Sequence, residues 1–224
     1  ILTSWSPPAW MKRNLAVGYG YASAPKYEDT DNILEPHYYG EFAESLVGAY
    51  RLFQEEANID LFGIGPQNEP AFTEPYASAV LSPYEYAKLM EKIGERFERE
   101  NINTKFYMPE QVFSQQHYPM KQYINTLENN YYAKRYVSVI ATHGYDETGT
   151  IGANPVWTDW RILYDQTNRG TRKELWMTET YPAYENWSSA FDLAMALHGA
   201  LVWGNVSWWT LWNIEGTLIK DNKP

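Results

Sequence analysis

Two carboxylates follow short apolar runs, and their chemistry decides what the rest of the chain must position. Glu69 follows the run Leu-Phe-Gly-Ile-Gly-Pro at 61–66 and the amide of Asn68, and Glu179 ends the run Leu-Trp-Met-Thr at 175–178. An apolar run that ends in polar groups is typical of a strand that displays side chains at the carboxyl edge of a parallel α/β fold. Two carboxyl groups at two such strand ends suggest a pair that cleaves a glycosidic bond.

The elements that must position this pair alternate regularly along the chain. Strands are expected at 1–4, from 61, and at 104–108, 137–141, 174–178 and 206–212; helices are expected at 37–58, 82–101, 120–130, 157–166 and 189–204. The strand-to-strand period of roughly 35 residues is what βαβ units need. No glycine motif for a phosphate cradle occurs. The pattern predicts an α/β fold of the (β/α)₈ TIM-barrel type that is incomplete, with 1–224 as one partial catalytic barrel domain.

Composition argues against several other classes of function. The formal net charge of −10, with both signs interspersed, disfavours a nucleic-acid partner, because phosphates need a basic surface. Without cysteine the chain has neither disulfides nor thiolate metal sites. No apolar run approaches the roughly 18 residues of a membrane span. The chain has four histidines, His37, His117, His143 and His198, and their spacing matches no metal-ligand motif. We therefore expect neither a metal nor a cofactor.

Aromatic residues are abundant, with ten tryptophans and 19 tyrosines. Core packing explains many of them. The alternative interpretation is a groove lined with flat rings, which suit the apolar faces of sugars while polar groups bind their edges.

The two carboxylate runs resemble the family 30 glycoside hydrolases, together with Ser6-Pro7-Pro8-Ala9-Trp10-Met11-Lys12 and Trp208-Trp209. The resemblance covers essentially the whole chain. It implies retaining chemistry on a (β/α)₈ barrel that carries a β-sandwich. It also places Ile1 in barrel strand three and residues 206–212 in strand eight, so strands one and two, the last helix and the sandwich are not expected within these residues.

The same resemblance assigns roles to individual residues. It implies that Glu69 is the acid/base and Glu179 the nucleophile. Glu110, which also ends an expected strand, is the second choice for a direct role. Five residues are expected to bind the sugar: Asn68, Trp10, His143, Tyr145 and Trp209. Asn68 would hydrogen-bond the 2-hydroxyl of the sugar, and Tyr145 would lie near the nucleophile.

Several functions stay open at this point. The leading hypothesis is an endo-acting β-1,4-xylanase on plant polysaccharide. A β-glucanase or β-glucosidase, on β-1,4, β-1,3-1,4 or β-1,6 linkages, is the enzyme alternative. A catalytically impaired fragment that only binds carbohydrate is the alternative from another class. Family members that demand a glucuronic acid side group use an arginine after strand eight, and residues 212–220 contain none. Strict glucuronoxylan specificity is therefore not expected.

Two further expectations concern the setting of the protein. The resemblance implies a secreted protein. A barrel that lacks two strands exposes two sheet edges, whose unpaired backbone groups invite association. We therefore expect this chain, expressed alone, to be oligomeric or weakly active, which light scattering and kinetics would check; a monodisperse, fully active monomer is the contrary result.

Overall fold

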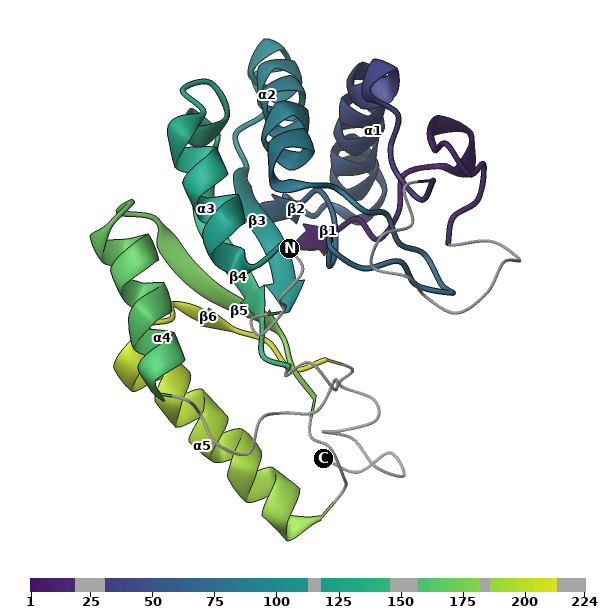
Figure 1. The fold of residues 1–224 in the computed structure, drawn as a ribbon. Coiled ribbons are helices and arrows are strands. Elements are labelled where there is room, and N and C mark those ends of the chain that lie inside the picture. Colours follow the sequence, from purple (N-terminus) through teal and green to yellow (C-terminus); the bar gives the residue numbers. More distant parts are fainter. Residues whose placement is uncertain (19–30, 113–117, 146–156, 182–185, 213–224) are drawn as a thin grey trace. The chain divides into compact units, whose positions relative to one another are not determined.

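The computed structural model describes residues 1–18, 31–112, 118–145, 157–181 and 186–212 (Figure 1). The chain divides into two compact units, residues 1–111 with 116–139 and residues 112–115 with 140–224, and each is described by itself. The helices of the described residues are α1 (Tyr39–Ala57), α2 (Pro83–Arg99), α3 (Met120–Asn129), α4 (Trp157–Tyr164) and α5 (Trp187–Gly204), with the short turns η1 (Ala9–Met11), η2 (Pro36–Tyr38), η3 (Ala133–Arg135) and η4 (Asp165–Arg169). The strands are β1 (Leu2–Thr3), β2 (Gly63–Gly65), β3 (Lys105–Val112), β4 (Val137–His143), β5 (Glu174–Glu179) and β6 (Trp208–Trp209).

The strands follow one another in the sheet in the order of the chain. The pairs β1–β2, β2–β3 and β5–β6 are parallel. Described helices alternate with these strands as expected, so the predicted α/β class is confirmed.

Two strands differ most from their expected bounds. Strand β3 continues through Pro109 to Val112 instead of ending at Met108, because these residues are buried and the carbonyl of Glu110 still accepts a backbone N–H from Glu69. Strand β6 is limited to Trp208 and Trp209. Backbone N–H groups of Ser207, Thr210 and Trp212 nevertheless donate to carbonyls of β5 and of the residue after it. The segment therefore runs beside β5 over most of its expected length.

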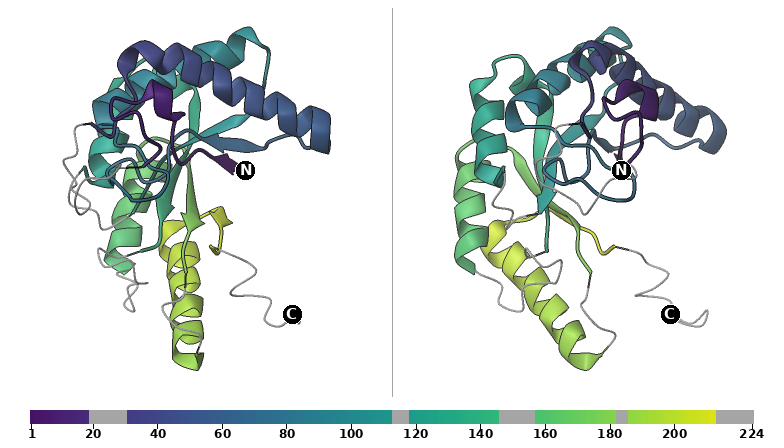
Figure 2. Two further views of the ribbon diagram at one scale, coloured as in Figure 1. Left: turned by 90° about the vertical axis from the view of Figure 1, so that its right-hand side faces the viewer. Right: turned by 45° about the vertical axis from the view of Figure 1, so that its right-hand side comes forward.

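In the first unit, α1, α2 and α3 lie side by side on the outer side of β1 to β3 (Figures 1 and 2). Helix α2 begins with a capping box, in which Ser82 Oγ accepts the N–H of Glu85 and the Glu85 carboxylate accepts the N–H of Ser82. Apolar residues on one face of these helices are buried, and each contributes about 1.5–3 kcal/mol by its burial. They include Phe42, Leu46, Leu89, Ile93 and Phe97.

Strand β2 consists of two glycines around Ile64 because a tyrosine from β3 crosses it. The ring of Tyr107 lies against Gly63 and Gly65. Its hydroxyl donates to the carbonyl of Leu2 at 2.8 Å and lies 2.9 Å from the hydroxyl of Thr3. Burial, and then the charge of Glu110, raise the pKa of Tyr107 well above its usual value, so the phenol keeps the proton that it donates. Tyr107 thus fastens β3 to β1 across β2.

Adding a methyl group at Gly65 is expected to destabilise the protein by about 1–3 kcal/mol, because overpacking a dense core forces side chains out of place. A Cβ there would overlap the Tyr107 ring beside its hydroxyl and lie 3.0 Å from the Glu110 carboxylate. Gly63→Ala is the matched control in the same strand: its Cβ would meet the ring at 3.2 Å, which asks for a smaller adjustment. Denaturant unfolding should therefore rank Gly65→Ala as the more damaging change, and equal effects would contradict this packing.

The second unit contains α4, α5 and the strands β5 and β6. Helix α5 packs on α4, and Gly204 lies against the ring of Trp160 at their contact. The side chain of Asn186 caps α5 by accepting the N–H of Ser189 at 2.9 Å. Trp176 pairs with Trp208 in the parallel register, and their rings stack with centroids 5.2 Å apart. No helix in the described part of the chain combines the length and the hydropathy that a membrane span requires.

Candidate active site

The segment that carries Glu69 is fixed from both neighbouring strands. Backbone N–H groups of Asn68 and Glu69 donate to the carbonyls of Ser4 and Glu110, at 2.8 and 3.0 Å. Asn68 is only 5% exposed. Glu69 itself adopts a left-handed backbone with φ of 39°, and Glu110 does so with φ of 58°. Such conformations cost free energy in a non-glycine residue and cluster at functional sites. The structure therefore holds the Glu69 backbone in a defined and strained geometry.

Gln67 supplies a second layer of bonds beneath this segment. It is fully buried, and its side-chain amide donates to the carbonyls of Trp5 and Asn68, both at 2.8 Å. Its backbone N–H donates to the hydroxyl of Tyr86 at 3.1 Å. Burial, and then the charge of Glu110, raise the pKa of Tyr86 well above its usual value. A neutral phenol can thus donate and accept at the base of the segment.

Glu110, the second choice for a direct role, has a buried side chain that is 1% exposed. Its carboxylate lies next to Gly65, and its charge acts on the nearby phenols of Tyr86 and Tyr107. Its backbone carbonyl is the acceptor for Glu69. This placement assigns Glu110 a supporting contact with Glu69; a direct role in chemistry stays a prediction.

Glu74 is a further carboxyl group in the first unit, on the loop after Glu69. Partial burial, and then the negative charge of Glu69, raise the pKa of Glu74 from 4.5 to about 6. Between these two pH values the folded chain keeps a proton that the unfolded chain releases. Ionisation of Glu74 therefore costs stability as the pH rises through about 6.

Glu74→Gln removes this penalty and is expected to stabilise the protein above pH 6 by up to about 1 kcal/mol, a figure discounted for the exposed half of the group. Below about pH 4.5, where the glutamate is protonated in both states, the variant and the unaltered chain should have equal stability. Denaturant unfolding at pH 4, 5, 6 and 7 measures the gap. A gap that widens toward low pH would contradict the assignment.

Trp10 lies on η1, in the turn that follows two prolines. Its side chain is 55% exposed, and its ring meets that of Tyr38 edge to face with centroids 5.2 Å apart. Met11 beneath it is buried, and the Met11 carbonyl accepts the N–H of Glu35 at 3.0 Å. An exposed ring on an anchored turn suits stacking on a sugar face.

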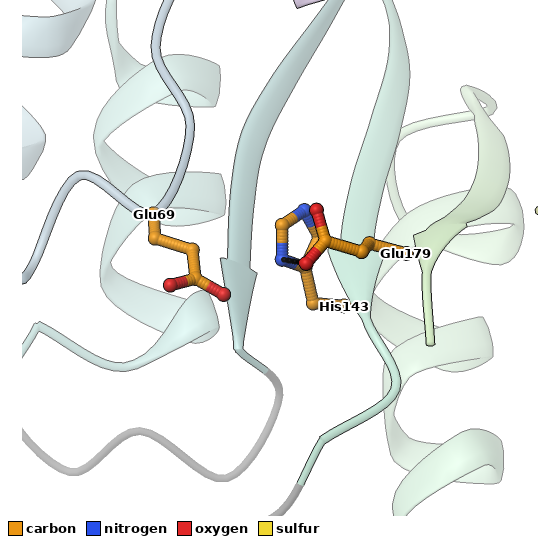
Figure 3. Close-up of side chains that lie close together, drawn as sticks. All are labelled: Glu69, His143 and Glu179. Atoms are coloured by element: carbon orange, nitrogen blue, oxygen red, sulfur yellow. Dashed lines mark ion pairs between the residues drawn. The ribbon is translucent and has the colours of Figure 1, made fainter. Parts of the chain in front are cut away.

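In the second unit, Glu179 and His143 lie together. Glu179 is the last residue of β5 and His143 the last residue of β4, and the Nδ1 atom of His143 lies 3.9 Å from a carboxylate oxygen of Glu179 (Figure 3). The backbone N–H of Gly144 donates to the carbonyl of Glu179 at 2.8 Å and aligns the two strand ends. Figure 3 also draws Glu69, which belongs to the first unit.

Tyr145 and Trp209 complete the predicted residues of this unit. The rings of Tyr145 and His143 meet edge to face with centroids 6.1 Å apart. Trp209 pairs with Met177 in the parallel register. Because side chains alternate along a strand, Met177 and Glu179 share one face of β5, and Trp209 lies on that same face. His143 thus lies close to both Glu179 and Tyr145, and Trp209 shares the face of Glu179. In the first unit, Asn68 and Glu69 are adjacent on one segment.

The sequence did not reveal the residues that hold the site in place, including Gln67, Tyr86 and Tyr107. Nothing local marks them, since their roles depend on partners far along the chain. Residues 213–220, most of the segment in which the sequence has no arginine, lie outside the described residues.

Comparison with known proteins supplies relatives for this arrangement. No family model matches the sequence. The chain is 25% identical to the glucuronoxylanase XynC of Bacillus subtilis over 97% of its length, and 26% identical to an endo-1,6-β-D-glucanase of Neurospora crassa over 84%. Its fold matches the crystal structure of the glycoside hydrolase family 30 subfamily 8 xylanase Xyn30A from Clostridium acetobutylicum, with a TM-score of 0.74 and 21% identity over 98% of the chain.

These matches confirm the resemblance and the barrel-type fold class, in an incomplete form. The chain covers 46% of the Bacillus relative, 36% of the Neurospora relative and 50% of the Clostridium chain. It thus spans about half the length of the proteins that it matches, or less.

Proposed function

We propose that this chain, which resembles the family 30 glycoside hydrolases in sequence and fold, carries the catalytic residues of a retaining β-glycanase. The observation that carries the proposal is the placement of two carboxylates. Glu179 ends β5, and Glu69 follows β2 by four residues on a segment bound to both neighbouring strands. In barrel enzymes the carboxyl ends of the strands bear the catalytic groups.

The proposed reaction proceeds by double displacement. Glu179 attacks the anomeric carbon while Glu69 gives its proton to the leaving oxygen, so the glycosidic bond breaks as an ester forms on Glu179. Water then attacks the same carbon, Glu69 takes the proton of that water, and the ester breaks. The mechanism requires the two carboxyl groups to lie about 5–5.5 Å apart, and it returns the β configuration.

His143 and Tyr145 are proposed to keep Glu179 ionised and oriented. The Nδ1 atom of His143 lies 3.9 Å from a carboxylate oxygen of Glu179, which is longer than a hydrogen bond and short enough for electrostatic attraction when the imidazole is protonated. Asn68 is proposed to hydrogen-bond the sugar 2-hydroxyl. Trp10 and Trp209 are proposed to line the sugar site, since one ring is exposed and the other shares the face of Glu179.

Xylan is the first proposed substrate, with internal cuts in a β-1,4-linked chain. The Bacillus relative, named a glucuronoxylanase, and the xylanase fold match favour it. A β-1,6-glucan is the second candidate, because the Neurospora relative is named an endo-1,6-β-D-glucanase and matches at nearly the same identity. Polymers of this size cannot enter a cell intact, so we also propose that the protein acts outside it; recovery of activity from culture medium tests this.

A panel of polymers tests the proposal. Reducing-end release and product masses would be measured on glucuronoxylan, arabinoxylan, β-1,3-1,4-glucan, β-1,6-glucan and cellulose, with Glu69→Gln as the control. If the chain releases reducing ends from one polymer and Glu69→Gln does not, the result would support catalysis and identify that polymer as the substrate. A chain that binds a polymer and cleaves none of the five would contradict the enzyme proposal and favour a carbohydrate-binding function.

A further inference from the structure

Lys12 is a buried lysine that no step of the proposed reaction uses. Its side chain belongs to a residue that is 1% exposed. Lysine is almost never fully buried unless its charge is compensated, because removing an ammonium from water costs several kcal/mol. A residue kept at this cost invites a specific explanation.

The ammonium of Lys12 makes three described hydrogen bonds. It donates to the carbonyl of Ser78 at 2.6 Å, to the carbonyl of Val17 at 2.9 Å and to the hydroxyl of Ser6 at 3.2 Å. An ammonium has three N–H donors, and these three acceptors match that number. The bonds converge on one point from three stretches of chain.

Two of these stretches flank the turn that carries Trp10. Ser6 precedes the two prolines, and Val17 lies beyond the turn. The backbone N–H of Lys12 closes η1 by donating to the carbonyl of Ala9 at 3.1 Å. Lys12 is therefore both the end of the Trp10 turn and the residue that ties its two flanks together.

The third stretch is the loop that follows Glu69. Ser78 on this loop donates its backbone N–H to Val17 at 3.0 Å, and its hydroxyl accepts from the buried Asn32 at 3.0 Å and from the N–H of Glu74 at 2.9 Å. The loop is joined to the Glu69 segment by the bond from the N–H of Phe72 to the Glu69 carbonyl, 3.0 Å. One ammonium thus connects the Trp10 turn to the chain that leaves Glu69.

We propose that Lys12 is a positioning residue, which holds the exposed Trp10 ring in register with the segment that carries Glu69. This inference rests on the proposed function and names the residue that keeps a sugar-stacking ring in place. Lys12 does not touch the substrate, because its ammonium is enclosed by its own acceptors. Without the ammonium, the buried carbonyl of Ser78 loses a donor, and the turn and the loop lose their shared contact.

The test compares Lys12→Met with Lys88→Met. Methionine keeps most of the apolar stem and removes every donor. Lys88 lies on α2, where its exposed side chain pairs with Glu91 at 2.9 Å. The control therefore removes a surface ion pair that contributes little to the stability of the fold. Both variants would be assayed below their unfolding transitions, by hydrogen exchange and by the affinity for an oligosaccharide of the preferred polymer.

Hydrogen exchange tests the connection independently of any substrate. Lys12→Met is expected to speed hydrogen exchange in peptides covering residues 9–18 and 69–81. In α1 and α2, its exchange rates should equal those of the Lys88→Met control. Unchanged exchange in both peptides would overturn the proposal. If hydrogen exchange changes as expected but the chain binds no oligosaccharide, the proposed function would be overturned. The connection that Lys12 makes between the Trp10 turn and the loop after Glu69 would still be supported.

Affinity then separates positioning from simple stabilisation. Lys12→Met is expected to raise the dissociation constant about tenfold, equivalent to one lost stacking contact. In a Trp10→Ala background the same change should have no effect, because residues that act through one contact are not additive. Lower thermal stability with unaltered affinity, or additive effects, would overturn the proposal. If Lys12→Met does not fold, Lys12→Gln, which keeps two N–H donors, undergoes the same comparison with the same criteria.

Discussion

Replacing Glu179 by alanine is expected to lower kcat by about 10⁴-fold or more, because removal of a nucleophile abolishes the covalent route. Added azide should restore part of the turnover. The small anion fits the space left by the side chain and attacks the anomeric carbon from the side that Glu179 used. Since no second displacement follows, the glycosyl azide should have the inverted, α configuration. Rates and proton NMR of the first product measure both effects.

Glu174→Gln is the matched control on the same strand. Glu174 is the first residue of β5, and its carboxylate accepts from Trp176 Nε1 and Ser207 Oγ, both at 3.1 Å. Because Glu174 and Glu179 are separated by an odd number of positions, they lie on opposite faces. This change should leave kcat within a few-fold. A β product from the rescued Glu179→Ala variant, or retained activity in it without azide, would contradict the nucleophile assignment.

Glu69→Gln is expected to lower kcat/KM on the polymer by about 10²–10⁴-fold, the usual contribution of a general acid. Glutamine keeps the size of the side chain and cannot give up a proton to the departing sugar. The loss should depend on the leaving group. An aryl glycoside whose phenolate leaves without protonation should form the glycosyl-enzyme at nearly the unaltered rate, while its hydrolysis slows because no base activates water.

Steady-state kinetics on a series of aryl glycosides, beside the polymer, would measure this dependence. Azide added to Glu69→Ala should yield a glycosyl azide of retained, β configuration, opposite to the product from Glu179→Ala. An equal loss on every leaving group would show that Glu69 does not serve as the acid. Glu110→Gln, which alters the buried neighbour, should show no such dependence on the leaving group.

The alternation of strands and helices was predictable because it depends on local periodicity. The capping box at Ser82 and Glu85 is visible in the letters alone, and the structure confirms it. Strand β3 was cut short at Pro109 because proline usually ends a strand. Its continuation depends on the bond from Glu69 to the Glu110 carbonyl, a contact that spans about forty residues of sequence and leaves no local sign.

The residues of the candidate site could be named from local sequence patterns only in part. Glu69 and Glu179 could be singled out because each follows an apolar run, and the run itself shows where a strand ends. The approach of His143 to Glu179 depends on the alignment of two strand ends, and the left-handed backbone of Glu69 depends on bonds to two other strands. The buried ammonium of Lys12 contradicts the ordinary expectation for lysine, so only the folded chain could show it.

Labelling with a 2-deoxy-2-fluoro glycoside of the preferred sugar, bearing an activated leaving group, tests whether Glu179 is the nucleophile. The fluorine slows both the formation and the hydrolysis of the covalent intermediate, whereas the activated leaving group speeds its formation alone, so the ester accumulates. We expect one glycosyl group per chain, located on Glu179 by peptide mass spectrometry. A label on another residue, or an unmodified Glu179 in a protein that is cleaving polymer, would contradict this expectation.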